Sequence, residues 1–361
     1  MARERPIGVH LHVPFLVVPR PWRVGQATFW PAGQLAVRLR STAGTTRHPV
    51  PKVLLDHATR TLDEEKWATV RVRAPLAQDL RGRDDYKAAV AAARDIARDS
   101  VAVLTLLKLD RHRLTSTKRQ SFGLALDVAS VREDYWVTTG RDRMLSVGGA
   151  WHGSVGSWDF GNPDIRHYRL DPRFRYLDQA LRTPDAARTE WQRRILSGLR
   201  TYVTANSGHR PAMRIILAAT ALEALIGNDF APGTAATGGH QLARRAAFVW
   251  CGAEFGDRHG SQRPICPFLA ELNGQQLDQK LRDEAARGVP WTCSYYADLR
   301  DLYDDRNAAL HGAEVRFTEQ LASRHEFTIE QVLFEVLEWV TASGAKTFAQ
   351  YEGAIGALPE Q

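Results

Sequence analysis

Apolar positions recur with one period in the first half of this chain and with another in the second. In the first half, short runs rich in β-branched and aromatic residues alternate with Pro and Gly, a pattern that predicts strands joined by turns. These runs are IGVHLHVPFLVV from residue 7, LAVRLR from 35, ATVRVRAPL from 68 and YWVTT from 135.

One long helix is predicted among these strands. Its apolar positions are spaced by three and four residues, the period of a single helical face, while Arg, Asp and Lys occupy the other side. The stripe runs through Tyr86, Val90, Ala93, Ala97, Val101 and Leu104. We expect this helix to pack on the sheet.

The second half has the period of helices, and Pro184 with Asp185 marks the change. One amphipathic stripe consists of Trp191, Ile195, Leu199 and Tyr202. The next segment, RPAMRIILAATALEALIG, is apolar almost all round, as in a central bundle helix. A capping-box spacing predicts that the last helix opens at Thr328, with Gln331 at its third position.

These patterns together predict an α+β protein. A mixed α/β domain over residues 1–182 is followed by an all-α helical bundle over 183–361. Glu223 is the one charge between Ile215 and Ile226 in the apolar helix of that bundle.

A second charge stands on a packing face of the bundle. In LRDLYDDRNAALHGAEV, Leu299, Leu302 and Leu310 follow one helical face, and Arg306 occupies the position that should continue it. An unpaired buried ion costs several kcal/mol, so Arg306 needs a partner, an interface or a substrate. Structural roles are available: Arg306 can pair with Asp301, with Asp305 or with Glu223. His311 before Gly312 suits a helix end.

Composition narrows the class of protein. The chain has 361 residues, of which 44% are hydrophobic and 25% charged, as expected for a soluble protein of two domains. No apolar run is long enough to span a membrane, and the start of the chain lacks the apolar stretch of a signal peptide. Three widely spaced cysteines fit neither a disulfide framework nor a metal knuckle. We expect a cytoplasmic protein.

Charge is divided unequally between the halves. Residues 1–182 carry 30 Lys and Arg against 19 Asp and Glu, a net +11, whereas residues 183–361 carry 18 against 22, a net −4. The basic half suggests a module that captures RNA or another polyanion, although basic composition also serves solubility. A module that senses a trigger is the other role open to residues 1–182. Lys118 and Arg119, in the basic run KLDRHRLTSTKR, are candidate RNA-binding residues, and a solvated basic turn is the plainer alternative.

The second half resembles a known superfamily. RNAALHG is similar to the R-N-x-x-x-H motif of the HEPN superfamily, and LRDLYDDRNAALHG with the upstream AATALEALIG resembles the Apea-like HEPN group. A helix with Arg244 and Arg245 lies between the two segments, in the same order. The resemblance covers about residues 188–352.

This resemblance implies an antiparallel helical bundle that dimerises, so that two R-x4-H motifs face one cleft. Many members are metal-independent endoribonucleases of toxin–antitoxin or phage-defence systems. The implied catalytic residues are Arg306, Asn307 and His311, and we add Glu223 as the carboxylate that holds Arg306. His can transfer protons near neutral pH, and the forked guanidinium of Arg can hold phosphate oxygens.

Two functions of different class remain open at this point. One is a HEPN endoribonuclease that cleaves RNA by attack of its 2′-hydroxyl; the other is a non-catalytic HEPN dimerisation or nucleic-acid-binding protein. Neither needs a metal or another cofactor. The expected partners are RNA, a second copy of the chain, and an antitoxin or trigger protein, with no membrane.

Overall fold

The chain is an α+β protein that divides into two compact units, Met1–Pro184 and Asp185–Gln361. The structure is a computed structural model. It describes residues 7–13, 16–31, 34, 37, 69–74, 83–112, 133–139, 144–150, 158–205, 210–227, 238–255, 272, 274–288, 294–312 and 317–355.

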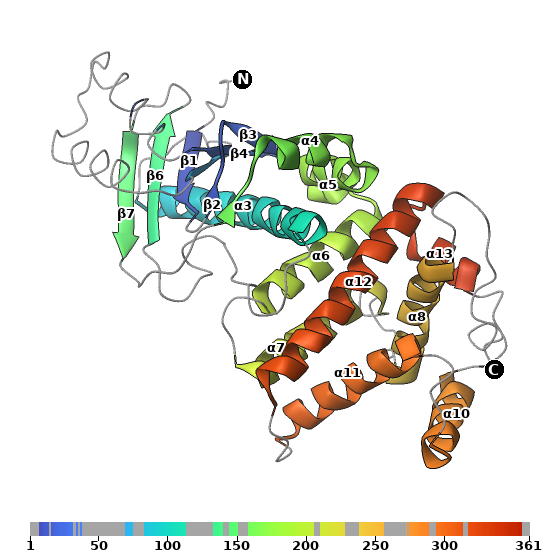
Figure 1. The fold of residues 1–361 in the computed structure, drawn as a ribbon. Helices are drawn as coiled ribbons and strands as arrows, with labels where there is room; N and C mark the ends of the chain where they lie inside the picture. The colour runs from blue at the N-terminus through green and yellow to red at the C-terminus, as the bar shows by residue number, and fades with distance from the viewer. Residues whose placement is uncertain are drawn as a thin grey trace. The chain divides into compact units, whose positions relative to one another are not determined.

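The first unit is built on a six-stranded antiparallel sheet (Figure 1). In spatial order its strands are β3 (Trp22–Val24), β4 (Ala27–Trp30), β5 (Thr69–Ala74), β1 (Ile7–His12), β6 (Glu133–Thr139) and β7 (Met144–Ala150). A separate parallel pair joins β2 (Leu16–Val17) to β8 (Trp158–Asp159). Three of the four predicted runs therefore contain strands.

The strand predicted at LAVRLR is wrong. Val37, the described residue of that run, is helical, and so is Gln34 just before it. Leu, Ala and Arg all favour a helix, which outweighs the single β-branched residue of the run.

The long helix α3 (Arg83–His112) packs on the sheet, as predicted. The residues of its predicted stripe from Val90 to Leu104 are all buried. Opposite them in the sheet, Val9 of β1 pairs in register with Val72 of β5, and both are fully buried. The alternating residues of the strands and the residues spaced by three and four in the helix thus face each other in one shared core.

Two short helices complete the first unit. They are α4 (Asn162–Leu170) and α5 (Pro172–Arg182), and the single residue between them, Asp171, ends one and caps the other. Both helices contact α3. Trp22 of the sheet packs edge-on against Tyr168 of α4, with ring centroids 5.4 Å apart.

The second unit is a helical bundle (Figure 1). After a 3-10 turn, η2 (Asp185–Ala187), come α6 (Glu190–Ala205), α7 (Pro211–Ile226), α8 (Gly239–Phe255), α10 (Gly274–Ala286), α11 (Ser294–Leu310), α12 (Glu319–Ser343) and α13 (Phe348–Ile355). The predicted stripe of α6 is buried, from Trp191 to Tyr202. The central helix α7 contacts α6, α8, α11 and α12.

The predicted start of the last helix is wrong in two respects. The helix that contains Thr328 begins nine residues earlier at Glu319, where Thr318 caps it by accepting a hydrogen bond from the Leu321 backbone N–H at 3.2 Å. Thr328 lies inside this helix and donates to the Arg324 carbonyl. A threonine hydroxyl inside a helix can bond to the carbonyl four residues before it. Thr328 can therefore lie in mid-helix, although its spacing to Gln331 is also that of a capping box. The helix that follows, α13, was not predicted.

Within the described part of the chain, no helix combines the length and the apolar character needed to cross a membrane.

Candidate functional site

The Arg306 side chain lies between α11 and α7, in the second unit. Its Nη2 is 3.3 Å from Oε1 of Glu223, and its Nη1 donates to Oδ1 of Asn307 at 3.1 Å. The guanidinium carbon also lies 5.4 Å from the centre of the Tyr303 ring, one turn back along α11. Three neighbours therefore hold the guanidinium: one carboxylate, one amide and one aromatic ring.

The helices set this position by their periods. Leu299 and Leu302 of α11 are buried, and Arg306 follows four residues later on the same side. In α7, Glu223 is the acidic side chain that faces this side among residues that are otherwise apolar. The side chains of Arg306 and Glu223 are 23% and 17% exposed, so the pair lies at the rim of the bundle.

One donor of Arg306 is left without a partner. Its Nε is buried and forms no hydrogen bond to the part of the chain that the structure describes. A buried N–H without an acceptor costs about 1–3 kcal/mol. Since a buried atom cannot itself meet a ligand, an anion would bind through the rest of the guanidinium, whose side chain is 23% exposed.

His311 lies just beyond the end of α11. Its backbone N–H donates to the Asn307 carbonyl at 3.0 Å, and Gly312 turns the chain with φ +66°. The His311 ring is exposed, and no hydrogen bond or ion pair joins it to a described residue. Leu310, expected on the buried stripe, is instead 50% exposed beside it.

The structure therefore brings together Glu223, Arg306 and Asn307, and leaves His311 at the adjacent helix end. Arg306 and His311 are five residues apart, about 140° around the helix axis, and no hydrogen bond joins their side chains. Lys118 and Arg119 lie outside the described residues.

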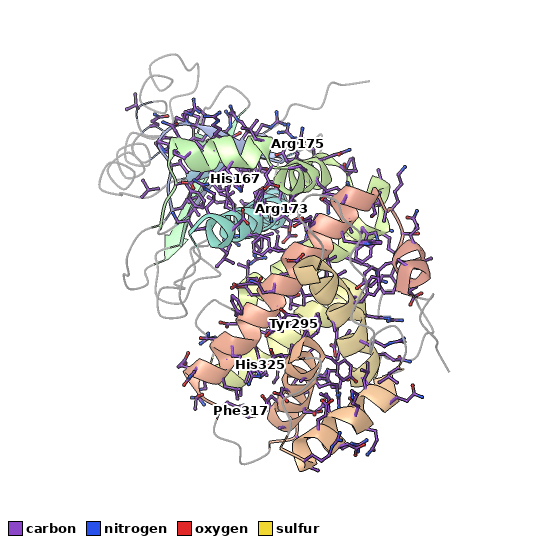
Figure 2. The ribbon with its side chains drawn as sticks, turned by 45° about the vertical axis from the view of Figure 1, so that its right-hand side comes forward. His167, Arg173, Arg175, Tyr295, Phe317 and His325 are labelled. Carbon is purple, nitrogen blue, oxygen red and sulfur yellow. The ribbon has the colours of Figure 1, made fainter. Side chains whose placement is uncertain are left out.

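The acidic residues next to Arg306 on α11 have other partners. Arg324 of α12 pairs with Asp298 and Asp301, and Nε2 of His325 lies 2.7 Å from Oδ2 of Asp305. His325, labelled in Figure 2, comes from α12. It is 1% exposed, and burial lowers the pKa of its ring, although the bond to Asp305 opposes this shift. Burial also raises the pKa of the Asp301 carboxyl. Of the carboxylates considered for Arg306, the structure selects Glu223.

The sequence did not predict a second arginine cluster, which is centred on Arg214 of α7. Arg214 donates to both carboxylate oxygens of Glu326, each at 2.6 Å, and also pairs with Glu319. Glu326 is fully buried. The two residues are 112 positions apart, and no local spacing announces a pair of that separation.

One group of side chains in the first unit has the composition of a metal site. Single ligand atoms of Asp110, His167 and Asp171 all lie within 4.8 Å of one another. However, Nη2 of Arg173 bonds to Asp110 at 3.2 Å and to Asp171 at 2.7 Å (Figure 2). A fixed guanidinium already compensates these carboxylates and would repel a metal cation, so the group fits an ion-pair network better.

Comparison with known proteins gives no match to a family model, to a functionally characterised protein or to a solved structure. The cluster around Arg306 is therefore interpreted from its own chemistry.

Proposed function

We propose that the second unit is a metal-independent endoribonuclease of the HEPN type. The observation that carries this proposal is the Arg306 guanidinium, which is held by Glu223 and Asn307 at the rim of the bundle, where its side chain stays 23% exposed. His311, one turn further on, supplies the titratable group that phosphodiester cleavage needs.

In the proposed reaction, the RNA 2′-oxygen attacks the adjacent phosphorus and the bond from phosphorus to the 5′-oxygen breaks. A base takes the proton of the 2′-hydroxyl, and an acid gives a proton to the leaving 5′-oxygen, so that a 2′,3′-cyclic phosphate and a 5′-hydroxyl form. Arg306 stabilises the negative charge that develops on the phosphorane oxygens. His311 performs one of the two proton transfers.

The second proton transfer requires a second group. We assign it to His311 of another copy of the chain, which makes the proposed enzyme a homodimer. Leu310, directly before His311, exposes half of its apolar surface at the rim of the site, where a second copy would cover it.

Glu223 acts in this proposal as a positioning residue. Its carboxylate holds Arg306 on the α7 side of the site, with Oε1 at 3.3 Å from Nη2. Phosphate oxygens can compete for the same guanidinium, because one partly exposed ion pair stabilises the free protein by at most about 1 kcal/mol.

The wider setting belongs to the same proposal. A cytoplasmic nuclease of this kind acts as a toxin or in phage defence, and an antitoxin or trigger protein controls it. The basic first half, with Lys118 and Arg119, captures the RNA.

The test is cleavage of a defined RNA by the full chain in excess EDTA, beside a His311→Ala variant. We expect the wild-type chain to produce 2′,3′-cyclic phosphate ends, and the variant to be slower by about 10²–10⁴-fold. Products with 3′-hydroxyl and 5′-phosphate ends, or activity only with added magnesium, would contradict the proposal. A folded, RNA-binding dimer that cleaves nothing would favour the non-catalytic alternative.

A further inference from the structure

The pair α4–α5 in the first unit combines many arginines with carboxylates that are all engaged inside the fold. Residues 162–182 contain five Arg, no Lys and three Asp. Asp164 accepts from the Gly161 backbone N–H at 2.7 Å, and Asp171 from that of Arg173 at 2.8 Å. Asp178 accepts from the Gly25 backbone N–H and from the Tyr168 hydroxyl, each at 2.7 Å. The carboxylates therefore stabilise the two helices and offer little charge to solvent.

Three of the arginines are exposed and have no such role. The side chains of Arg166 and Arg169 of α4 and of Arg175 of α5 form no hydrogen bond or ion pair with any described residue. Arg173 and Arg182, by contrast, bond to Asp171 and Asp178. We call Arg166, Arg169 and Arg175 the arginine surface.

The three side chains occupy exposed positions of the helix pair. Both helices pack on α3, and other residues of the pair, among them Tyr168 and Phe174, are buried. Arg173 reaches Asp110 of α3 at 3.2 Å, and Figure 2 shows Arg175 away from that contact. Residues three apart on a helix lie about 5–6 Å from each other, so Arg166 and Arg169 can contact neighbouring phosphates of one strand.

We propose that the arginine surface is a docking site for the phosphate backbone of RNA. Guanidinium forks bind phosphate oxygens in pairs and are weakly hydrated, which suits arginine better than lysine to this task. The partner class rests on the proposed nuclease function, and the site itself lies in a unit to which that function assigns no described residue.

The surface fits RNA better than a membrane. A helix that lies on lipid needs an apolar face open to the bilayer. On α4–α5, Leu170 is the large hydrophobic side chain that is exposed among the described residues, at 63%, while Ile165, Phe174 and Leu177 are buried. The three arginines beside Leu170 can attract anionic groups electrostatically, but the helix pair has no apolar face that could insert into a bilayer.

The experiment measures binding of a fluorescent single-stranded RNA by anisotropy over a salt series. All chains carry His311→Ala, so that binding is read without cleavage. The test chain adds Arg166→Gln, Arg169→Gln and Arg175→Gln. Its matched control adds Arg193→Gln, Arg282→Gln and Arg287→Gln, three exposed arginines of the second unit that bond only to backbone carbonyls.

We expect the test chain to bind RNA at least about tenfold more weakly near 0.15 M salt. The slope of log K against log salt should become shallower by about 2, since each lost phosphate contact on a single strand contributes about 0.7. The control, which removes the same charge, should keep the wild-type slope. Equal weakening in both chains, or normal binding by the test chain, would overturn the proposal.

A second arm measures binding to vesicles that contain phosphatidylserine. If the three substitutions abolish vesicle binding and leave RNA binding unchanged, the surface binds lipid and the proposal is wrong. The nuclease proposal is tested separately, by RNA cleavage with the wild-type chain. The binding measurement uses only chains that carry His311→Ala, so its outcome does not depend on cleavage.

Discussion

Two arginines at the central helix α7 differ in their surroundings: Arg214 belongs to α7 itself, and Arg306 of α11 pairs with Glu223 of α7. Arg214 of α7 has both oxygens of the fully buried Glu326 at 2.6 Å and a second carboxylate on Glu319. Arg306 has one carboxylate oxygen at 3.3 Å, and its buried Nε has no acceptor among the described residues. The Arg214 side chain is 12% exposed and holds a buried carboxylate, whereas the Arg306 side chain is 23% exposed at the rim. Pairing alone therefore does not separate structural from functional arginines; the burial of the paired carboxylate and the exposure of the guanidinium do.

The largest expected effect is the loss of folding stability when Arg214 is substituted. Arg214→Ala leaves the Glu326 carboxylate buried without its partner, which costs about 3–5 kcal/mol. Arg306→Ala should cost at most about 1 kcal/mol, because its pair with Glu223 is partly exposed. Urea unfolding of both variants measures this difference in the free energy of unfolding. Equal losses of stability would contradict the distinction between Arg214 and Arg306.

Glu223→Gln should affect catalysis more than stability. The amide can still accept a hydrogen bond from Arg306 but no longer neutralises it, so RNA phosphate meets less competition while the guanidinium is less firmly placed. We expect kcat to fall about tenfold, equivalent to about 1.4 kcal/mol, and KM to fall or stay constant. A rise in KM at constant kcat would mean that Glu223 serves substrate binding instead of positioning.

The pair of His325 and Asp305 gives the bundle a dependence on pH. The pKa of the His325 ring is lowered in the folded chain by burial, so the unfolded chain binds more protons below pH 6.5. The stabilisation is complete above pH 6.5 and is lost as the pH falls through the folded-state pKa. Urea unfolding between pH 7 and pH 5 should show this loss, and His325→Gln should make the profile flatter. An unchanged profile would show that His325 titrates alike in both states.

The smallest effect is expected at the end of α11, next to His311. Gly312→Ala places a side chain at φ +66°, which should cost about 1 kcal/mol. Gly353→Ala in α13 is the matched control, because it lies inside a helix and an added Cβ meets no atom within 4 Å. It should be neutral or stabilise by up to about 1 kcal/mol. Equal melting temperatures for the two variants would contradict the role of Gly312 as the helix terminator.

The sequence predicted what depends on local period. It predicted the buried stripes of α3 and α6 and the face of α11 that carries Arg306. The change to helices was expected at Pro184, but α4 already begins at Asn162, and neither α4 nor α5 was predicted. The sequence also named Glu223 as a partner of Arg306, since a lone carboxylate in an apolar helix needs a cation.

Long-range pairing could not be predicted in this way. Arg214 with Glu326 and Asp110 with His167 join residues that are 112 and 57 positions apart, and no periodicity relates them. The start of α12 was misplaced because Thr318 and Thr328 both precede helix-forming residues, and only the fold decides which hydroxyl caps. The exposure of Leu310 was missed for the same reason: the stripe continues in the sequence after the packing has ended.

The central claim is that Arg306 serves a substrate and Arg214 serves the fold. The most direct measurement compares RNA cleavage in EDTA with urea unfolding for two matched variants, Arg306→Gln and Arg214→Gln. We expect Arg306→Gln to lose cleavage by about 10²-fold or more while unfolding near the wild-type midpoint. Arg214→Gln should unfold much earlier and retain cleavage wherever it is folded. Wild-type cleavage by Arg306→Gln, or a loss of cleavage that follows only its loss of stability, would contradict the claim.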